Sequence, residues 1–117
     1  MNQDTRYNGW TNYETWLVNL WMDNSEGDQA YWQEQAQDAW NNAEPGQYDW
    51  QTREAEATRT LADSLKDWHQ PAASDITGIA GVFADLIGAA LGSVNWQEIA
   101  EHLIADAMYE DDKAEAA

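Results

Sequence analysis

Hydrophobic and polar positions alternate along most of this chain with a period of three to four residues, which is typical of amphipathic α-helices. The densest apolar stretch is residues 7–24, Y-N-G-W-T-N-Y-E-T-W-L-V-N-L-W-M-D-N. One helix face of this stretch is formed by Tyr13, Trp16, Leu17, Leu20 and Trp21. Thr11 followed by Glu14 matches a capping box. The pattern therefore predicts a helix over residues 11–23, around which the rest of the chain is organised.

Two more helices are predicted, separated by turn residues. Residues 24–27, N-S-E-G, favour a turn, and a helix is predicted over residues 28–43. Its apolar stripe consists of Trp32, Ala36, Ala39, Trp40 and Ala43. Pro45 and Gly46 then break the chain. A third helix is predicted from residue 49 or 50 to residue 68, and its buried face consists of Ala57, Leu61, Leu65 and Trp68.

A fourth helix is predicted to start at residue 74 or 75, and its apolar residues are Ile76, Ile79, Phe83, Leu86, Ile87 and Leu91. Three of its residues each weaken a helix by about 1 kcal/mol relative to Ala; they are Gly78, Gly81 and Gly88. Ala84, Gly88 and Gly92 stand four residues apart, so another backbone can approach closely along this stripe. One interpretation is a central core helix. The other is a self-association helix, forming a homodimer through Gly88 and Gly92, or a membrane-active helix; Asp85 argues against the membrane version.

The fifth helix has the clearest start signal. Asn95 can cap it, Glu98 falls at the third helical position, and Val94 can contact Ile99 as a hydrophobic staple. Residues 110–117 are predicted to be a flexible acidic tail. The apolar stripe of this helix consists of Ile99, Leu103, Ile104, Ala107 and Met108.

No strand pattern competes, so the predicted fold class is all-α: a single compact domain of about five helices over residues 1–117, with residues 1–10 as a polar lead-in. Eight tryptophans let a small domain bury much area with few side chains. The predicted core consists of Trp16, Trp21, Trp32, Trp40, Leu61, Leu65, Phe83, Ile87, Ile99 and Leu103.

Composition narrows the class of protein. A hydrophobic content of 44% favours a folded chain. The absence of cysteine excludes disulfides and thiolate metal sites. The opening M-N-Q-D-T-R has no apolar signal-peptide core, and the longest apolar run, residues 76–91, is shorter than a bilayer needs. We therefore expect a soluble cytoplasmic protein with no membrane partner.

Candidate catalytic and metal-binding groups are few. Neither His69 nor His102 has a metal-ligand spacing to a second histidine. Glu98 and His102 can meet on one helix, but the Glu-x-x-His spacing of di-metal bundles is absent. The acidic loop 23–28 fails the EF-hand pattern, because Gly27 comes one position too early. Motifs for a nucleophile, a phosphate loop or a zinc protease are also absent, so we expect no enzymatic activity and no cofactor or metal.

The charge distribution is more informative. The formal net charge is −17, from 22 Asp and Glu against 5 Lys and Arg. This excess makes direct binding of nucleic acid unfavourable, because phosphates would be repelled. Two explanations remain open: a partner with a strongly basic surface, or a high-salt cytoplasm.

Acidic residues are least compensated on the second and fifth predicted helices. On the third helix, Arg53, Arg59 and Lys66 can pair with Glu56, Asp63 and Asp67. In contrast, Glu34 with Asp38, and Asp106 with Glu110, are like charges four residues apart, separated by about 6 Å along a helix axis. That is close to the phosphate spacing of a nucleic-acid strand, roughly 6 to 7 Å. The predicted partner-binding residues are Glu34, Asp38, Glu98, Glu101 and Asp106.

Two blocks of the sequence resemble a known family. The segment W-T-N-Y-E-T-W-L-V-N-L-W-M-D-N, residues 10–24, is similar to the opening motif of a small uncharacterised family found in phages, plasmids and prokaryotic genomes. The block V-N-W-Q-E-I-A-E-H-L-I, residues 94–104, resembles a later helix of the same family. Together the blocks cover about a fifth of the chain. The resemblance implies a small helical fold and a mobile-element origin, but no catalytic residues.

These observations lead to a functional hypothesis. We expect a non-enzymatic acidic inhibitor that mimics DNA and occupies the basic surface of a DNA-binding host protein, such as a restriction nuclease, a CRISPR nuclease or a repressor. If the protein is phage-encoded, it would act in the host cytoplasm. The alternatives are an acidic helical adaptor of a mobile element or halophilic host, and a solvated acidic face without a partner.

Overall fold

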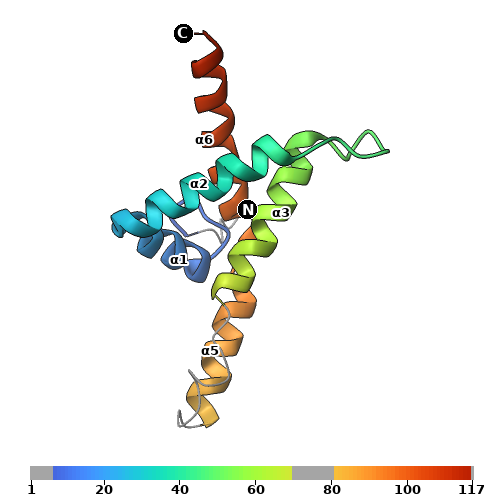
Figure 1. Ribbon diagram of the computed structural model, residues 1–117. Helices are drawn as coiled ribbons and strands as arrows, with labels where there is room; N and C mark the ends of the chain where they lie inside the picture. Colours follow the sequence, from blue (N-terminus) through green and yellow to red (C-terminus); the bar gives the residue numbers. More distant parts are fainter. Residues whose placement is uncertain (1–6, 70–80, 117) are drawn as a thin grey trace, which may run out of the picture.

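The computed structural model describes residues 7–69 and 81–116, and these residues form an all-α fold. Its helices are α1 (Tyr13–Asn24), α2 (Glu26–Asn42), α3 (Arg53–His69), α5 (Gly81–Ser93) and α6 (Trp96–Ala116), as Figure 1 shows. Within these ranges the only β-type pairing is an isolated bridge between Tyr7 and Trp10. The predicted fold class is confirmed.

The bridge belongs to a tight turn that precedes α1. The backbone N–H of Tyr7 donates to the carbonyl of Trp10 at 2.7 Å, and the N–H of Trp10 donates to the carbonyl of Tyr7 at 2.8 Å. Asn8 and Gly9 have φ angles of 49° and 87°. Asn-Gly is the pair that tolerates positive φ at both central positions, which a type I′ turn requires. The turn places the ring of Tyr7 4.9 Å from that of Trp16.

The capping box predicted at Thr11 is wrong, because Asn12 is the N-cap of α1. Its side-chain Oδ1 accepts a hydrogen bond from the backbone N–H of Thr15 at 2.9 Å. Asn caps a helix at least as well as Thr, and Asn12 directly precedes the first helical residue, Tyr13. The backbone N–H of Thr11 instead donates to Glu98 Oε1 at 2.8 Å, which ties the start of α1 to α6.

The other helix ends differ from the prediction by a few residues. Ser25 caps α2, so this helix starts at Glu26 instead of residue 28. Thr52 accepts the N–H of Ala55 at 3.0 Å, and α3 starts only at Arg53. The predicted cap of α6 is confirmed, since Asn95 Oδ1 accepts the N–H of Glu98 at 3.0 Å.

The ends of α5 and α6 also differ from the sequence pattern. Helix α6 continues to Ala116, through the segment for which a flexible tail was expected. Helix α5 ends at Ser93, beyond Leu91, the last residue of the predicted apolar set. The predicted start of this helix at residue 74 or 75 lies outside the described residues, as does Gly78.

The core lies where α2, α3 and α6 pack against one another, with α1 packed on α2. Trp32, Leu61, Leu65 and Ile99 are at most 2% exposed, which confirms four of the predicted core residues. Trp40 and Leu103 pack against this core, and Trp16 is half-buried. The buried apolar residues are Met22, Trp32, Ala36, Ala57, Leu61, Ala62, Leu65, Val94, Trp96, Ile99, Ala100, Ile104 and Ala107.

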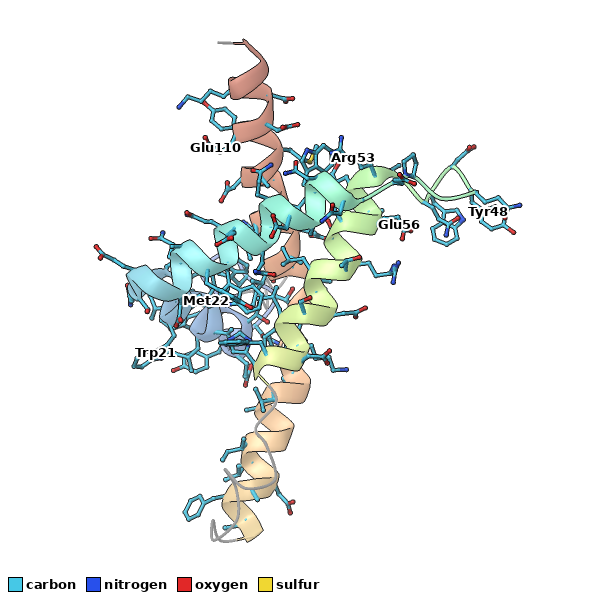
Figure 2. All side chains as sticks on the ribbon, viewed as in Figure 1. Trp21, Met22, Tyr48, Arg53, Glu56 and Glu110 are labelled. Carbon is cyan, nitrogen blue, oxygen red and sulfur yellow. The ribbon has the colours of Figure 1, made fainter. Side chains whose placement is uncertain are left out.

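Three predicted core residues are wrong, and so is the placement of Trp68 on the buried face of the third helix, since Trp68 is 60% exposed. Trp21 is 72% exposed, because α1 buries Thr15 and Met22 and the adjacent tryptophan points elsewhere (labelled in Figure 2). Phe83 and Ile87 are 59% and 37% exposed. Helix α5 packs mainly on α1 and buries none of its residues, so its interpretation as a central core helix is also wrong.

Candidate functional site

The outer face of α2 carries a row of carboxylates. Glu34 and Asp38 are exposed and stand two positions beyond the buried Trp32 and Ala36. Two residues along an α-helix turn about 200° around its axis, so these carboxylates point away from the core. The helix has no Lys or Arg to compensate them.

A second row of carboxylates lies on α6. Asp106 and Glu110 are exposed and one helical turn apart. They line a hollow of about 410 Å³ together with Gln33 and Gln37 of α2. These glutamines directly precede Glu34 and Asp38 in α2, so the first row is on the helix that forms the other wall of this hollow. We call the four residues Glu34, Asp38, Asp106 and Glu110 the acidic double row.

The remaining predicted partner-binding residues do not join this surface. Glu98 is half-buried and accepts the N–H of Thr11, so it serves the packing of α6 against the start of α1. Glu101 is exposed, but it stands five positions before Asp106. Five residues turn about 140° around a helix, so Glu101 lies on another side of α6. Only three of the five predicted residues are brought together.

Glu110, Gln33 and Gln37 are not among the predicted partner-binding residues. Glu110 could have been identified from the sequence, because it stands four residues after the predicted site residue Asp106. The two glutamines are also four residues apart, but a neutral pair gives no signal until α2 and α6 are placed side by side.

Two basic residues lie close to these helices. Lys113 is on α6, three positions after Glu110, whereas Arg53 at the start of α3 is bound to the end of α2. Arg53 donates from Nε and Nη2 to the carbonyl of Trp40 at 3.0 and 2.8 Å, and its guanidinium carbon lies 3.9 Å from the centroid of that indole. This satisfies a carbonyl at the C-terminal end of α2, where a cation is favourable. The indole Nε1 of Trp40 in turn donates to Asp111 at 3.1 Å.

Of the ion pairs predicted on α3, the described residues show one. Arg59 Nη2 lies 2.7 Å from Glu56 Oε2. The hydrogen bond to Glu56 and its negative charge raise the pKa of Arg59 above its ordinary value. Because Arg59 neutralises the charge of Glu56, α3 is less suited than α2 to attract a basic partner.

Both histidines pack against aromatic rings. The His69 ring stacks on Trp96 at 5.0 Å between centroids, and its Nδ1 lies 2.7 Å from the carbonyl oxygen of Leu65. The His102 ring lies 4.3 Å from that of Trp10. Across residues 7–69 and 81–116, no three His, Asp or Glu side chains are placed to hold a metal ion. In the same ranges no helix has both the length and the apolar character needed to cross a bilayer.

The two sequence blocks that carry the family resemblance meet in space. The side-chain amide of Asn12 donates to the carbonyl of Ser93 at 2.6 Å, and that of Asn95 donates to Thr11 Oγ1 at 3.1 Å. The N–H of Asn95 donates to Thr15 Oγ1 at 2.8 Å. These contacts join the caps of α1 and α6, so the two blocks build the framework of the fold and leave the acidic double row to other residues.

Fold and surface together define a small acidic all-α protein. Its sequence matches the model of the family of unknown function DUF7249 over residues 3–115, and the chain belongs to that family. No curated protein matches it, and no solved structure matches it either.

Proposed function

We propose that this protein is a non-enzymatic inhibitor that mimics nucleic acid and occupies the basic DNA-binding surface of a host defence protein, such as a restriction or CRISPR nuclease. The acidic double row carries this proposal. Its four carboxylates are exposed and lie on two helices that pack against each other. Glu34 and Asp38 have no Lys or Arg on α2 to offset them, while α6 carries one, Lys113.

The spacing within each row supports the proposal. Glu34 and Asp38, like Asp106 and Glu110, are one helical turn apart, which separates their Cα atoms by about 6 Å along the axis. Phosphates along one nucleic-acid strand are separated by roughly 6 to 7 Å. The two rows follow helices that cross steeply, as Figure 1 shows, so each row by itself offers a target a pair of charges at about the spacing of neighbouring phosphates.

The net charge also favours a basic target. With 22 acidic against 5 basic residues, this protein would be attracted over a distance to any strongly positive groove, and binding would release the counterions of that groove. We further propose an origin in a phage or plasmid, from the motif of residues 10–24, with the host cytoplasm as the place of action. In a mobile element, an inhibitor of a host nuclease protects the incoming DNA.

The experiment is a competition assay. Purified restriction and CRISPR nucleases are bound to a fluorescent DNA duplex, the protein is added, and fluorescence anisotropy and DNA cleavage are followed. We expect displacement of DNA from the target. The variants Glu34→Lys/Asp38→Lys and Asp106→Lys/Glu110→Lys should each bind the target about tenfold more weakly or worse.

Asp63→Lys/Asp67→Lys is the matched control, because it makes the same charge change at the same spacing on exposed positions of α3. It should retain most of the inhibition. Equal losses from all three variants would indicate attraction by net charge alone. If none of the variants changed inhibition, or if no nuclease or repressor released its DNA, the mimicry proposal would be wrong and the acidic adaptor would be favoured.

A further inference from the structure

The connection between α2 and α3 projects from the packed helices as a narrow loop, with Tyr48 at its far end (Figure 2). This loop, residues 43–52, carries two large aromatic side chains that the fold does not bury. Tyr48 is 57% exposed and Trp50 is 70% exposed. Exposed aromatic rings on a projecting loop are candidates for burial by a partner.

The loop is ordered by its own hydrogen bonds. The N–H of Gly46 donates to the carbonyl of Gln51 at 2.7 Å, and the N–H of Gln51 donates to the carbonyl of Tyr48 at 2.9 Å. The side chain of Gln51 fills the turn, where its Oε1 accepts the N–H of Tyr48 at 3.0 Å. A Cβ at Gly46 would lie only 2.7 Å from Gln51 atoms, so only glycine allows this close approach.

This arrangement holds the two rings in a defined geometry. The rings of Tyr48 and Trp50 are parallel within 4°, with their centroids 5.9 Å apart. A partner would therefore meet a fixed aromatic surface, and little side-chain entropy would be lost on binding.

The charge around the rings specifies the kind of group that would bind them. Glu44 and Asp49 are exposed in the same loop, and the sequence has no basic residue between Arg6 and Arg53. Aromatic faces next to carboxylates favour a guanidinium, which stacks on the ring and pairs with the acid.

The nearby arginines of this chain do not fill that role. Arg53 stacks on Trp40, 3.9 Å from the indole centroid. Arg59 lines a hollow beside Trp50, but it pairs there with Glu56 at 2.7 Å and is not stacked on the Trp50 ring. The contact of Arg53 with Trp40 shows within this molecule the type of contact that the loop offers to a partner.

We propose that the loop binds an arginine side chain on the basic surface of the target protein, with the guanidinium on the rings of Tyr48 and Trp50 and its charge facing Glu44 and Asp49. The identity of the target rests on the function proposed above. The acidic double row would supply attraction, and the loop would supply an aromatic anchor at the interface.

The experiment uses the full chain with a hexa-arginine peptide as probe and a hexa-lysine peptide for comparison. Binding is followed by the NMR signals of the indole N–H groups, with that of Trp50 assigned from Trp50→Phe. We expect the Trp50 signal to shift on addition of hexa-arginine. Tyr48→Ala/Trp50→Ala should weaken this binding about five- to twentyfold, and should weaken hexa-lysine binding less.

Two controls separate the aromatic effect from others. Trp21→Ala removes an equally exposed indole from α1 and should not change binding. Tyr48→Phe/Trp50→Phe keeps both aromatic faces and should retain most of the affinity. Circular dichroism should be the same for all variants, because these side chains are exposed.

The outcomes distinguish this site from the acidic double row. Hexa-arginine binding that is unchanged in Tyr48→Ala/Trp50→Ala, or absent in the natural protein, would overturn the loop site, whatever the competition assay with DNA gives. A loss in the loop variant but not in Glu34→Lys/Asp38→Lys would support the loop site and count against the double row. Losses in both variants, larger for arginine in the loop variant, would support the two surfaces together.

Discussion

Thr15 Oγ1 accepts a hydrogen bond from the backbone N–H of Asn95 at 2.8 Å and donates one to Asn12 Oδ1 at 2.6 Å. Thr15 is fully buried, and its hydroxyl links the N-cap of α1 to Asn95, the N-cap of α6, which stands 80 positions after Thr15 in the sequence. One hydroxyl therefore satisfies polar groups of both caps, and its loss would leave a donor and an acceptor, both partly buried, without this partner.

We predict that Thr15→Val destabilises the protein by about 1 to 3 kcal/mol. Valine has the same shape but no hydroxyl, so the N–H of Asn95 would remain desolvated without a partner. The measurement is the free energy of unfolding from urea denaturation. Thr58→Val is the matched control. Thr58 is also buried, but its hydroxyl donates to the carbonyl of Glu54 in its own helix, so its loss leaves only a spare carbonyl lone pair and should change stability little.

Trp32 and Trp21 give a second prediction. Trp32 is 2% exposed and lies in the core, whereas Trp21 is 72% exposed. Trp32→Ala should cost about 3 to 5 kcal/mol and unfold much of the protein, while Trp21→Ala should change stability by about 0.5 kcal/mol or less. Thermal melting followed by circular dichroism measures both. A similar fall in both melting temperatures would mean that the ring of Trp21 is buried in solution.

The sequence predicted the fold class and the helix order because each helix has a regular apolar stripe between strong turn signals. It predicted the Asn95 cap from the acid three positions later. It did not distinguish Thr11 from Asn12, since both are good caps and the choice depends on contacts with Glu98 and Ser93 far along the chain. The apolar residues of α1 are distributed around the whole helix, so the pattern did not show which side faces the core. Thr15 and Met22 are buried there, and Trp21 is not.

The candidate site was predictable in part. Spacing along a helix identified Glu34 with Asp38, and Asp106 with Glu110, as rows. Spacing did not show that Gln33 and Gln37 of α2 line one hollow with Asp106 and Glu110, because that contact depends on how α2 packs on α6. The Tyr48–Trp50 stack gave no signal, because residues 48 and 50 belong to a loop whose shape is set by Gly46 and Gln51.

Helix α5 leads to a third prediction, which concerns the proposed homodimer. Val82, Phe83 and Leu86 are each about 60% exposed. Apart from the adjoining residues and backbone of the helix itself, no atom lies within 4 Å of the position that a Cβ would take at Gly88 or Gly92. Asp85 is the only charged residue of α5, so two copies could meet there with little repulsion. We predict a dimer at high protein concentration in sedimentation velocity.

In the same experiment, Phe83→Glu/Leu86→Glu should raise the dimer dissociation constant about tenfold or more, because it places charge in the apolar contact. The matched control is Gln29→Glu/Ala30→Glu, which adds the same charge to exposed positions of α2 and should leave the dimer intact. A sedimentation coefficient that does not change with protein concentration would exclude self-association through α5.

The last prediction concerns salt, which separates mimicry from adaptation to a saline habitat. Repulsion among exposed carboxylates falls as the Debye length decreases from about 30 Å at 0.01 M salt to about 3 Å at 1 M. The free energy of unfolding in urea should therefore rise with the concentration of sodium chloride, and the protein should already be folded at low salt.

Glu34→Gln/Asp38→Asn removes one repelling pair and should stabilise the protein by a few tenths of a kcal/mol at low salt, and by nothing at 1 M. Asp106→Asn/Glu110→Gln should behave alike, since its carboxylates are also one turn apart. If the protein folded only near 1 M salt, its net charge of −17 would be explained by adaptation to a saline habitat. The main support for mimicry would then be lost.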